Sequence, residues 1–155
     1  MLIRLCYSSK YKQGQFTLVE DIRDILVVAR RFNQQHHICG VLYYADGSFF
    51  QCLEGENNTV RDLYDSILKD NRHQNVTLLK IDQIKSIKFE NWTMKYVESS
   101  NPIKSFFKKL NFGSFVPEQL DFKQLDQTLD LLYTEREQLF YSDLSDKNRI
   151  FSHYF

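Results

Sequence analysis

The sequence predicts an α+β protein in which the chain forms strand, helix, strand, strand, helix, strand and strand in that order, followed by further helices. Two patterns lead to this prediction. Apolar residues alternate where strands are expected, and they recur at three- and four-residue steps where helices are expected. In addition, a chain of 155 residues with 43% hydrophobic content can build one substantial core and is too short for two ordinary domains.

The first strand and the first helix have the clearest patterns. Residues 2–7 alternate so that one face is apolar and ends at Tyr7. Residues 17–32 repeat apolar side chains at helical spacing, and Thr17 and Glu20 have the spacing of a capping box. One further step of four residues along this apolar stripe reaches Asn33, so we expect a polar amide to point inward at the helix end.

A hairpin, a second helix and two more strands are expected next. Asp46-Gly47 between two apolar runs is a strong signal for a tight β-turn. Asn57 is a suitable cap for a helix whose apolar residues again recur at helical spacing. These elements are expected at residues 38–44, 49–53, 57–70, 76–84 and 92–97.

This order of elements matches the ferredoxin-like βαββαββ plan, a five-stranded sheet with two helices on one face. Right-handed crossovers put the first and third strands side by side at the centre of the sheet. Tyr7 and Gln51 are therefore expected to be neighbours. On the last strand, Trp92, Met94 and Tyr96 alternate, so we expect these three side chains to share one face.

The pattern changes at Asn101-Pro102, where a boundary is expected. We expect residues 1–98 to form one domain and residues 99–155 to form a C-terminal helical extension. The extension is expected to pack on the other face of the sheet, which the first two helices leave bare. Its helices are expected at residues 103–110 and 118–140.

Charge and cysteine content exclude several classes of function. Lys plus Arg equals Asp plus Glu at 20 each, so no basic excess favours nucleic acid or anionic lipid. We find neither a signal peptide nor an apolar stretch long enough to span a membrane. The three cysteines lack the spacing of zinc sites or of a secreted disulfide framework. We therefore expect free thiols, no metal, a cytoplasmic location, and no direct nucleic-acid or membrane partner.

Several short motifs occur in a specific order along the first 98 residues. They are Arg4-Leu5-Cys6-Tyr7-Ser8-Ser9, Ala29-Arg30-Arg31-Phe32-Asn33, Ile38-Cys39-Gly40-Val41-Leu42, Phe49-Phe50-Gln51-Cys52-Leu53-Glu54-Gly55, Asp70-Asn71-Arg72-His73 and Trp92-Thr93-Met94. By these motifs the chain resembles the BLUF domains, which are flavin-binding sensors of blue light, and in particular their short single-domain type.

The resemblance implies a non-covalent flavin, usually FAD with FMN as the alternative, held between the two helices and edge-on to the sheet. It implies that Tyr7 hydrogen-bonds Gln51, that Gln51 contacts the flavin N5 and C4 carbonyl region, and that Asn33 binds the pyrimidine edge. Met94 and Trp92 are implied to lie close to Gln51 and to complete the photoactive group. The implied cofactor-binding residues are Tyr7, Ile25, Phe32, Asn33, Gln51, Asp70, Arg72, His73 and Met94.

Some of these positions have a purely structural alternative. Asp70, Arg72 and His73 match the family segment near the ribityl and phosphate end of the cofactor, but polar residues at the end of a helix are also a common solvated stop. Ser66 stands where relatives often carry a basic residue, which bears on the choice between FAD and FMN. Phe32 suits either stacking on the flavin or ordinary core packing.

The resemblance also implies the photochemistry. Excited flavin is a strong oxidant, and the tyrosine supplies an electron and a proton that later return, leaving the glutamine amide rotated or tautomerised. The altered hydrogen bond to the C4 carbonyl shifts absorption to the red. Because net chemistry is zero, we expect no enzymatic activity.

The expected output is a light-dependent contact with a protein, namely a transcriptional or signalling regulator, or with a second copy of the chain. The signal is expected to pass from Gln51 through the last strand to the C-terminal helices. The alternative is a ferredoxin-like module that binds RNA or protein without flavin, although the aromatic-and-basic strands of RNA-binding modules are missing. Phosphate-processing enzymes of this topology need an anion-binding loop, whereas Ser8-Ser9-Lys10 includes no glycine.

Overall fold

The computed structural model describes residues 1–140, and its helices and strands follow the predicted order. Their bounds are β1 Leu2–Tyr11, α1 Leu18–His36, β2 Cys39–Ala45, β3 Ser48–Glu56, α2 Asn57–Ile67, β4 His73–Gln83, β5 Lys95–Glu98, α3 Asn101–Lys109, the 3-10 helix η1 Pro117–Gln119 and α4 Phe122–Thr134. The strands form one five-stranded sheet in the order β4-β1-β3-β2-β5. The predicted α+β ferredoxin-like fold is therefore confirmed.

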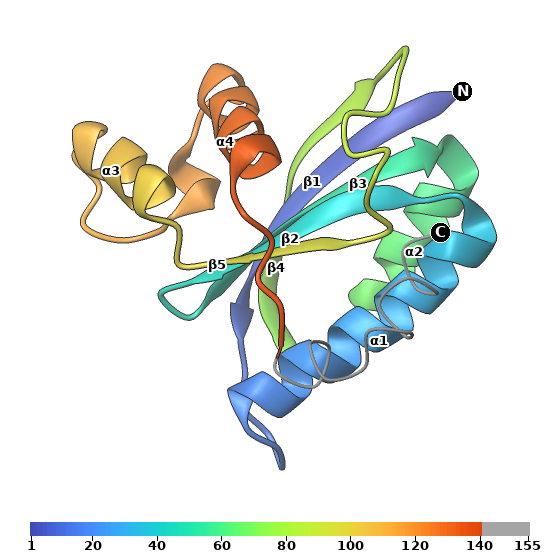
Figure 1. Ribbon diagram of the computed structural model, residues 1–155, viewed down its shortest axis with the longest axis horizontal. Coiled ribbons are helices and arrows are strands. Elements are labelled where there is room, and N and C mark those ends of the chain that lie inside the picture. Colours follow the sequence, from blue (N-terminus) through green and yellow to red (C-terminus); the bar gives the residue numbers. More distant parts are fainter. Residues whose placement is uncertain (141–155) are drawn as a thin grey trace.

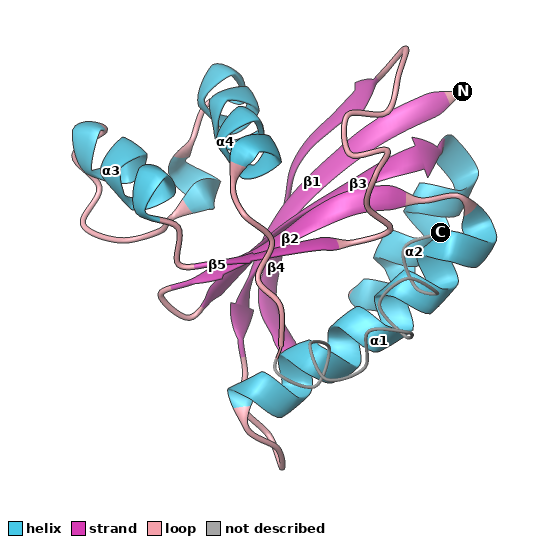
Figure 2. Cartoon of the chain, viewed as in Figure 1, coloured by secondary structure: helices cyan, strands magenta, loops and turns pink. Residues whose placement is uncertain are grey.

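The sheet separates two apolar cores. Helices α1 and α2 lie on one face, whereas α3 and α4 lie on the other (Figures 1 and 2). Ile22 and Leu26 of α1 are buried in the first core, and Leu129 and Leu132 of α4 are buried in the second. Each such side chain contributes roughly 1.5–3 kcal/mol by leaving water, which is why both helices stay on the sheet. The C-terminal helices thus cover the face on which they were expected.

The strand register brings the two central candidates together. Strands β1 and β3 pair antiparallel, with Tyr7 directly opposite Gln51. Strand β2 pairs antiparallel with β3 and parallel with β5, so β5 is an edge strand. Parity therefore places Tyr7 and Gln51 on the same face of the sheet, toward α1 and α2.

Two glycines meet specific backbone demands. The β2–β3 turn has positive φ at Asp46 (52°) and Gly47 (76°), as a tight hairpin turn requires. At Gly40 an added Cβ would lie 2.1 Å from the carbonyl oxygen of Cys52. The Gly40 amide also donates to the carbonyl of Trp92 at 3.2 Å, which holds the segment before β5 next to β2.

The expected shared face of Trp92, Met94 and Tyr96 is wrong. Strand β5 begins only at Lys95, so the alternation of a strand does not apply to residues 92–94. Met94 and Tyr96 are buried in the core beneath α1 and α2, whereas Trp92 packs against the core beneath α3 and α4. The Trp92 amide donates to the carbonyl of Phe89 at 3.0 Å, and this bond closes a turn over residues 89–92, just before the irregular segment that leads into β5.

The last helix is shorter than predicted. The sequence predicted a helix over 118–140, but α4 spans Phe122–Thr134 because Asp121 caps its start in a capping box and residues 135–140 leave the helix. These six residues, which we call the C-terminal strap, run beside β5, where the Gln138 amide donates to the carbonyl of Tyr96 at 2.8 Å. Figure 1 shows the chain leaving α4 and running across β5 toward α1.

The boundary expected between residues 98 and 99 stays a prediction, and residues 141–155 of the expected extension lie outside the described residues. Helices α3 and α4 share a core with the sheet, including Cys6 and Phe50 of the central strands. The first two helices are shifted slightly from their predicted ends: α1 extends to His36, and α2 stops at Ile67.

Candidate functional site

A cavity of about 220 Å³ lies between α1 and α2 over the central strands. Its lining comprises Tyr7, Ile25, Val28, Ala29, Phe32, Asn33, Gln51, Leu63, Ser66, Ile67, Asp70, Arg72 and His73. The contributions of each helix recur at three- and four-residue steps, so one stripe of α1 faces one stripe of α2 across the space. Eight of the nine predicted cofactor-binding residues line this cavity, and the ninth, Met94, contacts Gln51.

Tyr7 is held as a neutral phenol. Its side chain is buried, and its hydroxyl donates a hydrogen bond to Oε1 of Gln51. Burial raises the pKa of Tyr7 far above its ordinary value, and the negative charge of Asp70 and the neighbouring Tyr64 raise that pKa further. The phenolic proton is therefore retained and shared with Gln51.

Gln51 connects Tyr7 to Met94. While Oε1 of its amide accepts from Tyr7, Nε2 donates to the sulfur of Met94 at 3.4 Å. An amide is the neutral side chain that offers a donor and an acceptor together, so reversing it exchanges both contacts at once. Met94 is flexible and polarizable, which suits a partner that must tolerate such an exchange.

Asn33 presents an unmatched acceptor beside this pair. Its Nδ2 donates to the carbonyl of Thr93 at 2.7 Å. Within residues 1–140, its buried Oδ1 has no hydrogen-bond partner. A buried polar atom of this kind costs about 1–3 kcal/mol, so the cavity fits a ligand that brings an N–H donor.

The far end of the cavity is polar. Burial alone would raise the pKa of Asp70, but the Arg72 guanidinium, 2.7 Å away, holds it below its usual value. Arg72 also pairs with Asp24 at 2.7 Å. Burial lowers the pKa of His73, whose Nδ1 lies 2.7 Å from Oγ of Ser9. The ion-paired guanidinium of Arg72, the carboxylate of Asp70 and the imidazole of His73 therefore stand at this end.

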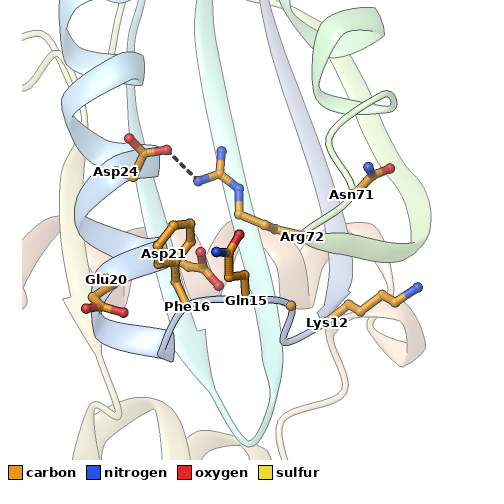
Figure 3. Close-up of a pocket in the computed structure, with 9 residues that line it drawn as sticks. Lys12, Gln15, Phe16, Glu20, Asp21, Asp24, Asn71 and Arg72 are labelled. Carbon is orange, nitrogen blue, oxygen red and sulfur yellow. Dashed lines mark hydrogen bonds and ion pairs between the residues drawn. The ribbon is translucent and has the colours of Figure 1, made fainter.

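A second, larger space adjoins that end. This cleft of about 640 Å³ is lined by Lys12, Gly14, Gln15, Phe16, Glu20, Asp21, Asp24, Asn71 and Arg72. Figure 3 shows Arg72 reaching across it to Asp24, with Phe16 at its lower side. We call this space the Arg72 cleft, because Arg72 lines both the cavity and the cleft.

Trp92 does not lie beside Gln51, contrary to the expectation from the sequence. Its indole packs against Phe89 and Tyr133 with ring centroids 6.2 and 5.8 Å apart. The ammonium of Lys95 lies 4.4 Å from the centroid of the indole, and Lys95 also donates to the carbonyl of Tyr133 at 2.9 Å. Trp92 is on the opposite side of the sheet because residues 92–94 precede β5 and do not follow the alternation of a strand.

Sequence reasoning missed several cavity residues, although a signal for them existed. Val28 and Ala29 continue the stripe through Ile25 on α1, and Leu63 and Ile67 flank Ser66, the position already noted for its lack of a basic residue, on α2. Helical periodicity had assigned Ala29, Leu63 and Ile67 only to the buried faces of their helices, and it had given Val28 no role. Arg30, quoted as part of a motif but given no role, donates from Nε to the carbonyl of Met94 at 3.1 Å.

Comparison with known proteins identifies this arrangement. The family model described as "Sensors of blue-light using FAD" matches residues 2–95. The chain belongs to the BLUF family. It has the BLUF fold and is a flavin-binding sensor of blue light, and the unmatched acceptor of Asn33 beside the Gln51 amide fits the hydrogen-bonding edge of a flavin.

Two solved structures of a BLUF protein, BlsA, match most of the chain. The photo-activated state has a TM-score of 0.87 and 41% identity, covering 90% of this chain and 100% of that chain. The ground state has a TM-score of 0.86 and 42% identity, covering 90% and 92%.

Curated relatives match only in part. The Escherichia coli blue light- and temperature-regulated antirepressor BluF is 33% identical over 89 residues, which are 57% of this chain and 22% of the relative. The Euglena gracilis photoactivated adenylate cyclase subunit beta is 35% identical over 75 residues, 48% of this chain and 9% of the relative. The chain thus matches less than a quarter of either relative.

Proposed function

We propose that Tyr7 and Gln51 are the photochemical centre of this sensor and that its output is a light-dependent contact with a regulatory protein. The observation that supports this most directly is the buried hydrogen bond from Tyr7 to Gln51 in the cavity that also holds the unmatched acceptor of Asn33. Three groups suited to a flavin edge converge there from β1, β3 and α1.

The residues would act as follows. A bound flavin supplies the light absorption and the oxidising power. Tyr7 would be the residue that lends one electron and its phenolic proton to this oxidant and later takes both back, so that the chain would undergo no net reaction. Gln51 carries the hydrogen-bond change, because reversing its amide exchanges the groups that face Tyr7 and Met94. Asn33 holds the cofactor's N–H edge, while Ile25 and Phe32 enclose its ring. No enzymatic turnover is proposed.

The first test is spectroscopic. The purified protein is expected to be yellow, to shift to the red under blue light, and to recover in darkness. Tyr7→Phe should keep the yellow colour and lose the shift, because a phenyl ring has no proton to give. Tyr43→Phe is the matched control, since Tyr43 is also buried but lies in the core beneath α3 and α4. A full photocycle in Tyr7→Phe would refute the role of Tyr7.

We propose FAD rather than FMN as the cofactor, with its adenylate half in the Arg72 cleft. Arg72 lines both spaces and could hold the phosphates between them. Phe16 is 55% exposed in the cleft and offers a face for adenine. Two cleft carboxylates already have protein partners: Asp21 accepts from Tyr11, and Asp24 pairs with Arg72. A phosphate must therefore displace or share the Asp24 contact.

The cofactor choice is tested by the ratio of FMN to FAD dissociation constants. Phe16→Ala should lower that ratio by about 2- to 12-fold, the range expected for losing one aromatic stack. Phe122→Ala is the control, because Phe122 is similarly exposed but lies at the start of α4. Equal affinity for FMN and FAD in the unmodified chain would overturn FAD preference and leave the photochemical proposal standing.

For the partner, we propose a transcriptional or signalling regulator in the cytoplasm. The name of the Escherichia coli relative, an antirepressor, supports a regulator as the target. The three cysteines are free thiols, which suits a reducing compartment. No helix within residues 1–140 is both long enough and apolar enough to cross a bilayer. Light-dependent self-association is the competing outcome, distinguishable by size-exclusion chromatography under illumination.

A further inference from the structure

The C-terminal strap, residues 135–140, covers the outer edge of β5. The inner edge of β5 pairs with β2, and the strap passes over the other edge at Tyr96. Within residues 1–140 a single backbone hydrogen bond joins the strap to β5, from the Gln138 amide to the carbonyl of Tyr96. A sheet edge offers backbone groups to any extended chain, so another segment can take the place of the strap there.

Side chains provide most of the strap's attachment. The ring of Phe140 stacks on that of Tyr96, with centroids 5.8 Å apart and planes 9° from parallel. The guanidinium of Arg23 lies 5.8 Å from the centroid of the Phe140 ring. Glu137 pairs with Arg30 at 3.1 Å, and their side chains are only 18% and 11% exposed. The edge therefore recognises a carboxylate and, three residues later, an aromatic ring.

Arg30 ties this attachment to the flavin cavity. Its NH2 group pairs with Glu137, while its Nε donates to the carbonyl of Met94 at 3.1 Å. The sulfur of Met94 accepts from Gln51. These contacts form a continuous route from the Gln51 amide to the strap through Met94 and Arg30, outside the core beneath α3 and α4.

We propose that the strap is a built-in occupant of the β5 edge, that light loosens it through Arg30, and that the uncovered edge then binds an extended segment of a partner protein with a carboxylate three residues before an aromatic side chain. The partner segment would take the path of the strap over the β5 edge: its main chain would donate to the carbonyl of Tyr96, and its carboxylate and aromatic ring would contact Arg30 and Tyr96. This proposal rests on the photochemistry proposed for Gln51, and it specifies the surface at which the regulator binds.

Hydrogen exchange on the full flavin-loaded chain tests the release. We expect the Gln138 amide to exchange at least about tenfold faster under blue light than in darkness, because its acceptor on Tyr96 would be lost. In darkness, Glu137→Gln should speed this exchange, whereas Glu98→Gln at the exposed end of β5 should not. Arg30→Gln should act like Glu137→Gln, with exposed Arg31→Gln as its control. Equal exchange in light and darkness would overturn the release.

A peptide with the strap's own sequence, residues 135–140, tests the binding surface. Labelled with a fluorophore, it should bind the illuminated full chain at least about tenfold more tightly than the dark chain. Peptides that carry Gln for Glu137 or Ala for Phe140 should bind weakly in both conditions. Light-independent binding, or a light-induced dimer in which copies exchange straps, would overturn the proposed partner segment.

The red shift recorded in the same samples separates the two proposals. A normal shift with unchanged strap exchange overturns only the strap, and the photochemistry stands. If no shift occurs, the proposed photochemistry fails. The dark comparison of Glu137→Gln with Glu98→Gln then still decides whether the ion pair to Arg30 holds the strap.

Discussion

Replacing Asn33 by alanine separates two functions of one buried amide. Its Nδ2 bond to Thr93 stabilises the fold, while its Oδ1 is proposed to hold the cofactor. Losing the first bond and leaving the Thr93 carbonyl unmatched costs about 1–3 kcal/mol. The better helix propensity of alanine offsets roughly 0.5 kcal/mol of this. Removal of the unmatched Oδ1 offsets more of this cost, so the free energy of unfolding without flavin should fall by at most about 2.5 kcal/mol.

The flavin dissociation constant should rise separately. One neutral hydrogen bond is worth about 0.5–1.5 kcal/mol, which corresponds to a loss of roughly 2- to 12-fold in affinity. Urea unfolding of the flavin-free protein measures the first effect, and quenching of flavin fluorescence on titration measures the second. Gln35→Ala, an exposed position on the same helix, controls for general effects of substitution in α1. A variant that is destabilised but binds flavin with unchanged affinity would refute the assignment of Oδ1 to the cofactor.

Three further substitutions test other parts of the structure. Burial lowers the pKa of His73, so below about pH 6.5 the unfolded chain binds a proton that the folded chain does not. Stability should therefore fall as the pH drops below that value. Urea titrations should show a flatter pH dependence of the free energy of unfolding in His73→Gln, and an unchanged pH dependence would contradict this role of His73. The buried carboxylate of Glu54 accepts from Arg4 and from the amides of residues 88 and 89, so Glu54→Ala should cost about 3–5 kcal/mol in urea unfolding, whereas Glu56→Ala at the exposed ion pair with the N-terminus should change little. Trp92→Phe should keep the red shift, because Trp92 packs on Tyr133 across the sheet from Gln51, and a lost shift would contradict that placement.

Local patterns predicted the core of this fold because the apolar residues of each element repeat with a single spacing, that of a strand or that of a helix. The Asp46-Gly47 turn fixed the β2–β3 register, and that register fixed which face Gln51 occupies. Tyr7 followed by topology alone, since β1 and β3 must be neighbours in this plan. Asn33 was found because the apolar stripe of the first helix continues onto this polar residue. A polar side chain on a buried helix face needs a hydrogen-bond partner from elsewhere.

The sequence patterns missed residues whose positions depend on contacts with residues distant in sequence. Lys95 is 2% exposed, and no pattern of charged residues predicts burial of a lysine between an indole and the end of a helix. The strap was predicted as helix because Leu139 continues the stripe of α4. The interaction of Phe140 with Tyr96 competes with that helix, and such a contact between residues distant in sequence cannot be read from a local window.

Both wrong predictions for secondary structure adjoin β5, and the reason bears on function. A central strand such as β3 is fixed by backbone ladders on both sides, so its position leaves little freedom. Strand β5 has one ladder, to β2; one backbone hydrogen bond from Gln138, the side chain of Lys95 toward α4, and the bond from Arg30 to the carbonyl of Met94 just before the strand also hold it. Side-chain contacts can be exchanged singly, whereas a ladder must be broken together. The element that local patterns describe least well is therefore a strand held by a single backbone ladder, next to the Met94 contact of Gln51.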